Sequence, residues 1–191
     1  MLVEDVLISG CDSAGAEMAI ILRRKLGAAV VLRDLRRYGL SDLTLRPDAS
    51  DTEWGSVLSL GEDEVPVTPL QVSTFLRAAG QGGAKLFSTG TAQRLRAALD
   101  GVVQHGTAAG IKHALADTGW RIGGKTGTGP GECGDTCDGW FAGLLSDQRG
   151  ARYVILVFIK GKGLGGGLAA RTAASMAEYL VQRESEGRKP W

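Results

Sequence analysis

The sequence has almost no net charge, few cysteines and histidines, and no long apolar run. Its 191 residues include 22 lysines and arginines against 21 aspartates and glutamates, which leaves a formal net charge of +1. Such a balance carries no electrostatic footprint for nucleic acid or for an anionic membrane surface. No stretch approaches the roughly 20 apolar residues that cross a bilayer. The N-terminal stretch also lacks the basic start of a signal peptide and is interrupted by Glu4, Asp5, Asp12 and Glu17.

The scarcity of cysteine and histidine argues against a metal centre. There are three cysteines and two histidines, and a structural zinc site takes four such ligands at characteristic spacings. Cys133 and Cys137 lie close together in the polar loop "GECGDTCDG", but this C-x-x-x-C spacing matches no established zinc pattern. The pair is compatible with a loop disulfide, half a metal site or two free thiols. We predict no metal ion and no cofactor.

The patterns that are present predict one α+β domain over residues 1–191, with a mainly helical part over 1–118. Apolar side chains at helical spacing indicate helices over residues 13–26, 30–38, 69–79 and 91–104. Thr68 and Pro69 suit the N-cap and the first position of the third of these helices. Residues 40–65 contain turn formers such as Pro47 and Gly55, so we expect an irregular surface connection there.

Short β-branched or aromatic runs replace the helical period after residue 118. They predict three antiparallel strands, "WRIGGKTGT", "GWFAGLL" and "ARYVILVFI", with a turn from Asp147 to Gly150 between the last two. A closing helix is expected over residues 168–183, and residues 184–191 form a tail. The predicted fold is a helical subdomain followed by a three-stranded antiparallel sheet and a C-terminal helix.

The stretch "GWRIGGKTGTGPG" fits two different sites. Gly119 to Thr126 satisfies the phosphate-loop pattern G-x-x-x-x-G-K-[ST] letter for letter. A phosphate loop needs a helix that begins at the Lys-Thr pair, and the five glycines and the proline in "GTGPGECGDTCDG" oppose one. A P-loop NTPase is therefore the weaker alternative. The other site places "KTGT" on a strand at the edge of a sheet.

Four passages at this order and spacing resemble the transpeptidase domain of penicillin-binding proteins. They are "VPVTPLQVSTFLRAAGQGG", "LRAALDGVVQHGTA", "GGKTGTG" and "DGWFAGLL", and the resemblance extends from about residue 3 to 182. The family consists of serine-type D,D-transpeptidases and carboxypeptidases, which cross-link or trim peptidoglycan stem peptides and are acylated by β-lactams. Its machinery combines an S-x-x-K, an S-x-N and a K-[ST]-G motif.

The resemblance gives the third of these motifs to residues 125–128. It implies that Lys125 supports the proton network of catalysis and that Lys125, Thr126, Gly127 and Thr128 line the substrate groove. At Gly127, side-chain bulk would collide with a ligand. The competing interpretation is a plain glycine-rich strand with no functional role.

The other two motifs are degraded or missing. "GCDSAG" places Gly10 where the S-x-N serine belongs and Asp12 where its asparagine belongs. Glycine cannot relay a proton, and a carboxylate only accepts hydrogen bonds. Asp12 or Ser13 is more simply interpreted as a helix N-cap. No serine is followed three residues later by lysine, so the nucleophilic motif is absent. We expect an incomplete β-lactamase/transpeptidase-like sheet with three of five strands and one exposed edge.

These observations predict a penicillin-binding, peptidoglycan D,D-transpeptidase-like protein that is inactive as this chain alone. The alternative is a non-catalytic relative that binds or scaffolds in the cell envelope. The expected ligands are a peptidoglycan stem peptide or a β-lactam, and the expected partner is the missing N-terminal part of the domain or another envelope protein. By resemblance the protein is extracytoplasmic, and we expect its export signal to lie on residues outside this sequence.

Overall fold

The computed structural model describes residues 2–40, 44–61, 66–129, 137–161 and 165–187. Its elements follow the predicted change from helix to sheet and back to helix. In chain order they are α1 (Val3–Ser9), α2 (Asp12–Leu26), α3 (Ala28–Arg37), α4 (Asp51–Leu60), α5 (Pro69–Gly80), α6 (Thr89–His105), η1 (Ala109–Ile111), β1 (Arg121–Thr128), β2 (Gly139–Asp147), β3 (Gly150–Ile159), η2 (Gly165–Ala169) and α7 (Ala170–Ser185). None of the helices described is long and apolar enough to span a membrane.

The three strands form an antiparallel sheet in the order β1-β2-β3, as the sequence predicts. The turn from Asp147 to Gly150 joins β2 to β3, and the backbone N–H of Arg149 donates to the Asp147 carboxylate at 2.8 Å. In the register of β1 against β2, Lys125 lies opposite Ala142 and Thr126 opposite Phe141. Strands β1 and β3 are the two edges of the described sheet, so "KTGT" lies along an edge.

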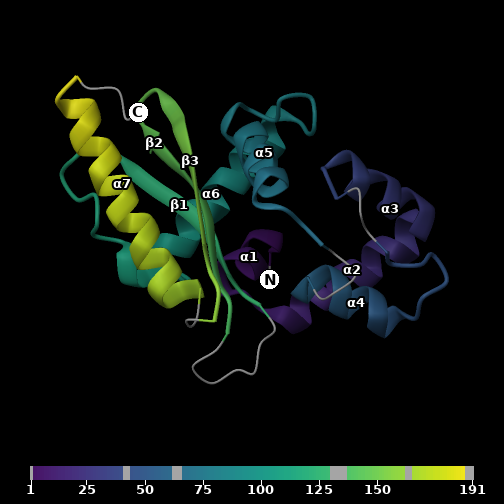
Figure 1. The fold of residues 1–191 in the computed structure, drawn as a ribbon. Helices are drawn as coiled ribbons and strands as arrows, with labels where there is room; N and C mark the ends of the chain where they lie inside the picture. The colour runs from purple at the N-terminus through teal and green to yellow at the C-terminus, as the bar shows by residue number, and fades with distance from the viewer. Residues whose placement is uncertain (1, 41–43, 62–65, 130–136, 162–164, 188–191) are drawn as a thin grey trace.

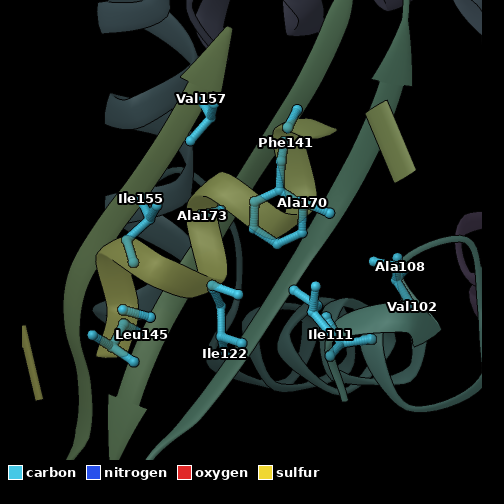
Figure 2. Packing of buried hydrophobic residues seen from close by; sticks show 14 of the residues in the cluster. Val102, Ala108, Ile111, Ile122, Phe141, Leu145, Ile155, Val157, Ala170 and Ala173 are labelled. Carbon is cyan, nitrogen blue, oxygen red and sulfur yellow. The ribbon is translucent and has the colours of Figure 1, made fainter. Parts of the chain in front are cut away.

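Helices cover both faces of this sheet (Figure 1). Alanines of α7 pack on the face that presents Phe141, Leu145 and Ile155, and Figure 2 shows these side chains beside Ala170 and Ala173. On the opposite face, Leu76 of α5 and Leu99 of α6 pack on Leu144. Because α6 also contributes Val102 and Val103 to the α7 side, it joins the two apolar clusters.

Two glycines of the sheet, Gly124 in β1 and Gly143 in β2, lie against one aromatic ring. A Cβ at Gly124 would lie 2.4 Å from Cζ of Phe141, and a Cβ at Gly143 would lie 2.9 Å from Cε1 of the same ring. Phe141 is completely buried. Its ring therefore occupies the space that side chains on the neighbouring glycines would need, which is a known way of protecting glycine within a sheet.

Helices α2, α3 and α4 form a separate group on the far side of α1 from the sheet (Figure 1). Helices α3 and α4 and the segment before α4 form a cluster of their own, which consists of Val31, Leu32, Leu45, Ala49, Trp54 and Val57. The prediction of an irregular connection over residues 40–65 was wrong for Asp51–Leu60, which form α4, and correct for residues 44–50. Residues 41–43 and 62–65 lie outside the described residues. Ser50 caps this helix by accepting from the backbone N–H of Glu53 at 3.2 Å, and the Glu53 carboxylate accepts from the backbone N–H of Ser50.

The cysteines lie in two different environments. Cys11 is a free thiol at the N-cap of α2. Cys137 is buried and disulfide-bonded. Cys133, the other member of the predicted loop pair, lies outside the described residues, as do residues 188–191 of the predicted tail.

Candidate active-site groove

The lysine-threonine-glycine tract is extended backbone at the edge of the sheet. Lys125, Thr126, Gly127 and Thr128 are all paired within strand β1, which ends at Thr128. A phosphate loop would instead place Lys125 at the start of a helix. No helix starts at these residues, so the structure lacks the anion-binding geometry of a P-loop there.

Lys125 is half-buried, and its ammonium group donates to the backbone carbonyl of Thr126 at 2.8 Å. Burial lowers the pKa of Lys125 below its usual value, and the nearby negative charge of Asp12 opposes part of that shift. Both residues line a hollow of about 320 Å³ between strand β1 and helices α1 and α2. The hollow therefore contains a partly desolvated cation with one carboxylate near it.

Gly10 lies beside the ammonium group of Lys125 at this hollow. It ends helix α1 in a left-handed conformation with φ 64°, and a Cβ at this position would lie 3.5 Å from Nζ of Lys125. Asp12 follows as the first residue of α2, whose N-cap is Cys11. The expectation that Asp12 or Ser13 is the N-cap was therefore wrong. The fold brings Lys125 next to positions 10 and 12, which precede it by more than a hundred residues in the sequence.

The titration of Lys125 should respond to the charge at position 12. Replacing Asp12 by asparagine should lower the pKa of Lys125 further, because it removes the charge that opposes the desolvation shift. The ¹³Cε chemical shift of Lys125, followed by NMR as the pH rises, measures this directly. Asp48→Asn is the matched control, since it removes the same charge from an exposed carboxylate beside Arg46. An unchanged pKa in Asp12→Asn would show that Asp12 does not act on the lysine.

Gly127 and Thr128 are the last two residues of β1. Gly127 lies opposite Trp140, and a Cβ there would lie 3.3 Å from Cβ of Trp140. Thr128 is exposed. Beyond it, the backbone N–H of Gly129 donates to the carbonyl of Asp138 at 2.8 Å, which ties the end of β1 to the start of β2.

One neighbour of the tract was missed by the sequence analysis. Thr107 lies between α6 and η1, and its hydroxyl is 2.6 Å from the hydroxyl of Thr126. The only signal for it was its place in "LRAALDGVVQHGTA", where nothing separated it from an ordinary residue after a helix. The two threonines are 19 residues apart, and only the packing of α6 along β1 brings them together.

Two serines lie at or near the hollow, and each is hydrogen-bonded to a neighbour. Among the described residues that line the hollow, the hydroxyl of Ser59 donates to the carbonyl of Asp12 at 2.7 Å. The nearby Ser13 hydroxyl is paired with the thiol of Cys11. The pKa of that thiol is lowered, first by its hydrogen bond with Ser13 and next by the backbone N–H of Ala14. A strand edge, a cation and threonine hydroxyls can hold an extended chain with a carboxylate.

The fold is shared with solved transpeptidases and β-lactamases. The D,D-transpeptidase domain of a peptidoglycan glycosyltransferase from Eggerthella lenta superposes with a TM-score of 0.69 at 20% identity, over 98% of this chain and 54% of that one. A β-lactamase from Sphaerobacter thermophilus superposes with a TM-score of 0.54 at 19% identity, over 90% of this chain and 59% of that one. The chain thus has a transpeptidase/β-lactamase-like fold and spans little more than half the length of these structures.

The sequence also matches the defining pattern of the penicillin binding protein transpeptidase domain over residues 22–178. The chain therefore belongs to this family. The match includes residues 125–128 and leaves Gly10 and Asp12 outside its limits. Among curated proteins, the sequence finds no match.

Proposed function

We propose that the chain is the peptide-binding part of a penicillin-binding transpeptidase in cell-wall synthesis. Its ligands are a peptidoglycan stem peptide that ends in a carboxylate and the β-lactams that resemble it. The observation that carries the proposal is the extended Lys125–Thr128 edge, whose lysine faces Gly10 and whose Thr126 hydroxyl is paired with Thr107.

The chemistry of this edge suits such a ligand. An edge strand can bind an extended peptide through backbone hydrogen bonds, while pockets select its side chains. The ammonium of Lys125 attracts the carboxylate, and its half-buried position strengthens that attraction relative to bulk water. The hydroxyls of Thr126 and Thr128 supply donors, and Gly127 leaves room for the ligand backbone.

The proposal includes the absence of acylation by this chain alone. The sequence holds no S-x-x-K motif, and Gly10 supplies no hydroxyl beside Lys125. The alternative is a non-catalytic relative that uses the same groove for scaffolding, and the substitutions at Gly10 and Asp12 favour it. In either case we place the protein outside the cytoplasm, in the cell envelope, because the family acts on the cell wall.

Completion of the fold by a further polypeptide segment is part of the same proposal. The hollow beside Lys125 adjoins two apolar hollows of about 290 and 340 Å³, since Leu35 and Leu7 are shared between neighbours. Tyr38 and Phe75 line both of the other two hollows. The solved transpeptidase domain has a further part with no counterpart in this chain. We propose that a segment corresponding to that part covers the surface formed by these three hollows. A natural monomer rarely leaves so continuous an apolar surface uncovered.

The binding of a peptide ending in D-Ala-D-Ala tests the function. We expect calorimetric binding to the wild-type chain and a loss of at least about tenfold in Lys125→Met, which keeps the length of the side chain but removes the charge. Lys160→Met, an exposed lysine beyond strand β3, is the matched control and should bind normally. Failure of the wild-type chain to bind would reject the function. A stable covalent adduct with fluorescent penicillin would reject the claim that the chain does not acylate.

A further inference from the structure

Thr107 forms a hydroxyl pair with Thr126 that has an unused proton. The two Oγ1 atoms are 2.6 Å apart, and either can be the donor. No other hydrogen bond of either hydroxyl is found among the described residues. Each hydroxyl has one proton and two acceptor positions, so the pair consumes one proton and leaves the other for an outside acceptor.

The position of the Thr107 backbone is set by close contacts on two sides. A Cβ at Gly106 would lie 2.3 Å from the carbonyl oxygen of Ile8 in α1, and a Cβ at Gly166 in η2 would lie 2.4 Å from the carbonyl oxygen of Thr107. At Gly106 the chain therefore approaches the backbone of α1, and at Gly166 the chain approaches the backbone of Thr107, more closely than a side chain would allow. Strand β1 fixes Thr126 through its pairing with Phe141. The hydroxyls of Thr107 and Thr126 meet because these contacts and the strand pairing fix the backbones of both residues.

The Thr107 methyl group also lies at the site. A Cβ at Gly10 would lie 3.4 Å from Cγ2 of Thr107 and 3.5 Å from Nζ of Lys125. Thr107 thus stands between the degraded second motif and the lysine-threonine-glycine tract. A ligand that reaches Lys125 and Thr126 passes beside it.

We propose that Thr107 is a positioning residue, which holds the Thr126 hydroxyl so that the free proton of the pair points to a carboxylate in the groove. The inference rests on the proposed function and adds a residue to it from outside the three family motifs. A proton already aligned needs no reorganisation when the ligand arrives, and a chain of hydroxyls strengthens the final hydrogen bond. A carboxylate gains more from this than a neutral amide, because hydrogen bonds to charged groups are stronger.

The ligand test compares a peptide ending in D-Ala-D-Ala with the same peptide ending in a carboxamide. We expect Thr107→Val to reduce the preference for the acid over the amide by about tenfold, the value of one hydrogen bond to a charged group. Thr107→Ser keeps the hydroxyl and should restore the preference. An unchanged preference in Thr107→Val, or an equal loss for acid and amide, would overturn the inference.

A double-mutant cycle separates positioning from a general structural effect. If Thr107 acts through Thr126, then Thr107→Val should change the acid preference in the wild-type background and leave it unchanged in Thr126→Val. Equal effects in both backgrounds would contradict the proposed pairing.

A measurement without ligand tests the same inference independently. Three-bond couplings to the γ-methyl group of Thr126 should indicate one side-chain rotamer in the wild type and in Thr107→Ser, and rotamer averaging in Thr107→Val. Identical couplings in the three proteins would show that Thr107 does not orient Thr126. If the wild-type chain binds neither peptide, the proposed function is rejected, and these couplings still decide the role of Thr107.

Discussion

Gly124→Ala is expected to lower the free energy of unfolding by about 3 kcal/mol or more, at the upper end of the effects of overpacking. The new Cβ would lie 2.4 Å from Cζ of Phe141 and 2.9 Å from the carbonyl oxygen of Ala142. Phe141 is fully buried, and close packing in a protein interior leaves a buried ring little room to shift. Either the ring leaves its rotamer or β1 separates from β2, and both changes reach the strand that carries Lys125.

The same strand offers a matched control in Gly127→Ala. Its Cβ would meet only Trp140, at 3.3 Å from Cβ and 3.9 Å from Cγ, and Trp140 is half-buried. We expect a loss of at most about 1 kcal/mol in stability, together with a clear loss of peptide binding, because the methyl group enters the proposed ligand path. Urea denaturation and calorimetry measure the two effects. Equal destabilisation by the two substitutions would contradict the role given to the Phe141 ring.

The sequence predicted the sheet well because its strands are specified locally. Each strand is a short β-branched or aromatic run between turn residues, and these signals need no knowledge of the rest of the fold. Helix α4 was missed because one of its local signals was misinterpreted. Gly55 was taken as a turn former, whereas the reciprocal cap of Ser50 and Glu53 starts a helix that carries Gly55 in its interior.

The site was predictable only where a motif lies within one strand. Residues 125–128 were identified from their order, and the structure places them on the edge of the sheet. That Gly10 faces Lys125, and that Thr107 reaches Thr126, depends on how α1 and α6 pack against β1. These helices pack against β1 because they bury whole apolar faces, and this burial leaves no sequence pattern at Gly10 or Thr107 themselves.

The apolar cluster on the α7 side of the sheet and the cluster of the helical group differ in extent. The sheet cluster joins α6, α7 and all three strands, whereas the helical cluster is confined to α3, α4 and the segment before α4. The hollow that contains Lys125 is bounded by both parts, since Met18 of α2 and Leu58 of α4 line it together with the lysine. The groove therefore depends on the helical part as a wall, and that part has the smaller core.

Trp54→Ala tests this dependence and is expected to cost about 3–5 kcal/mol, the usual effect of truncating a buried tryptophan. Trp54 is fully buried and is the largest side chain in the helical cluster. Its indole N–H donates to the carbonyl of Arg46 at 3.3 Å, and the guanidinium of Arg23 lies 5.3 Å from the ring centroid. Trp54→Phe keeps an aromatic ring and loses the donor, so it should cost distinctly less.

Amide hydrogen exchange, measured by mass spectrometry, shows which helices and strands are destabilised in Trp54→Ala. In Trp54→Ala we expect peptides from α2 and α4 to lose protection while peptides from β2 and β3 retain it, because the two clusters share no buried residue. Peptide binding should weaken in parallel, since α2 and α4 form the wall opposite Lys125. Equal loss of protection in the sheet would show instead that the helices and the sheet unfold as one cooperative unit.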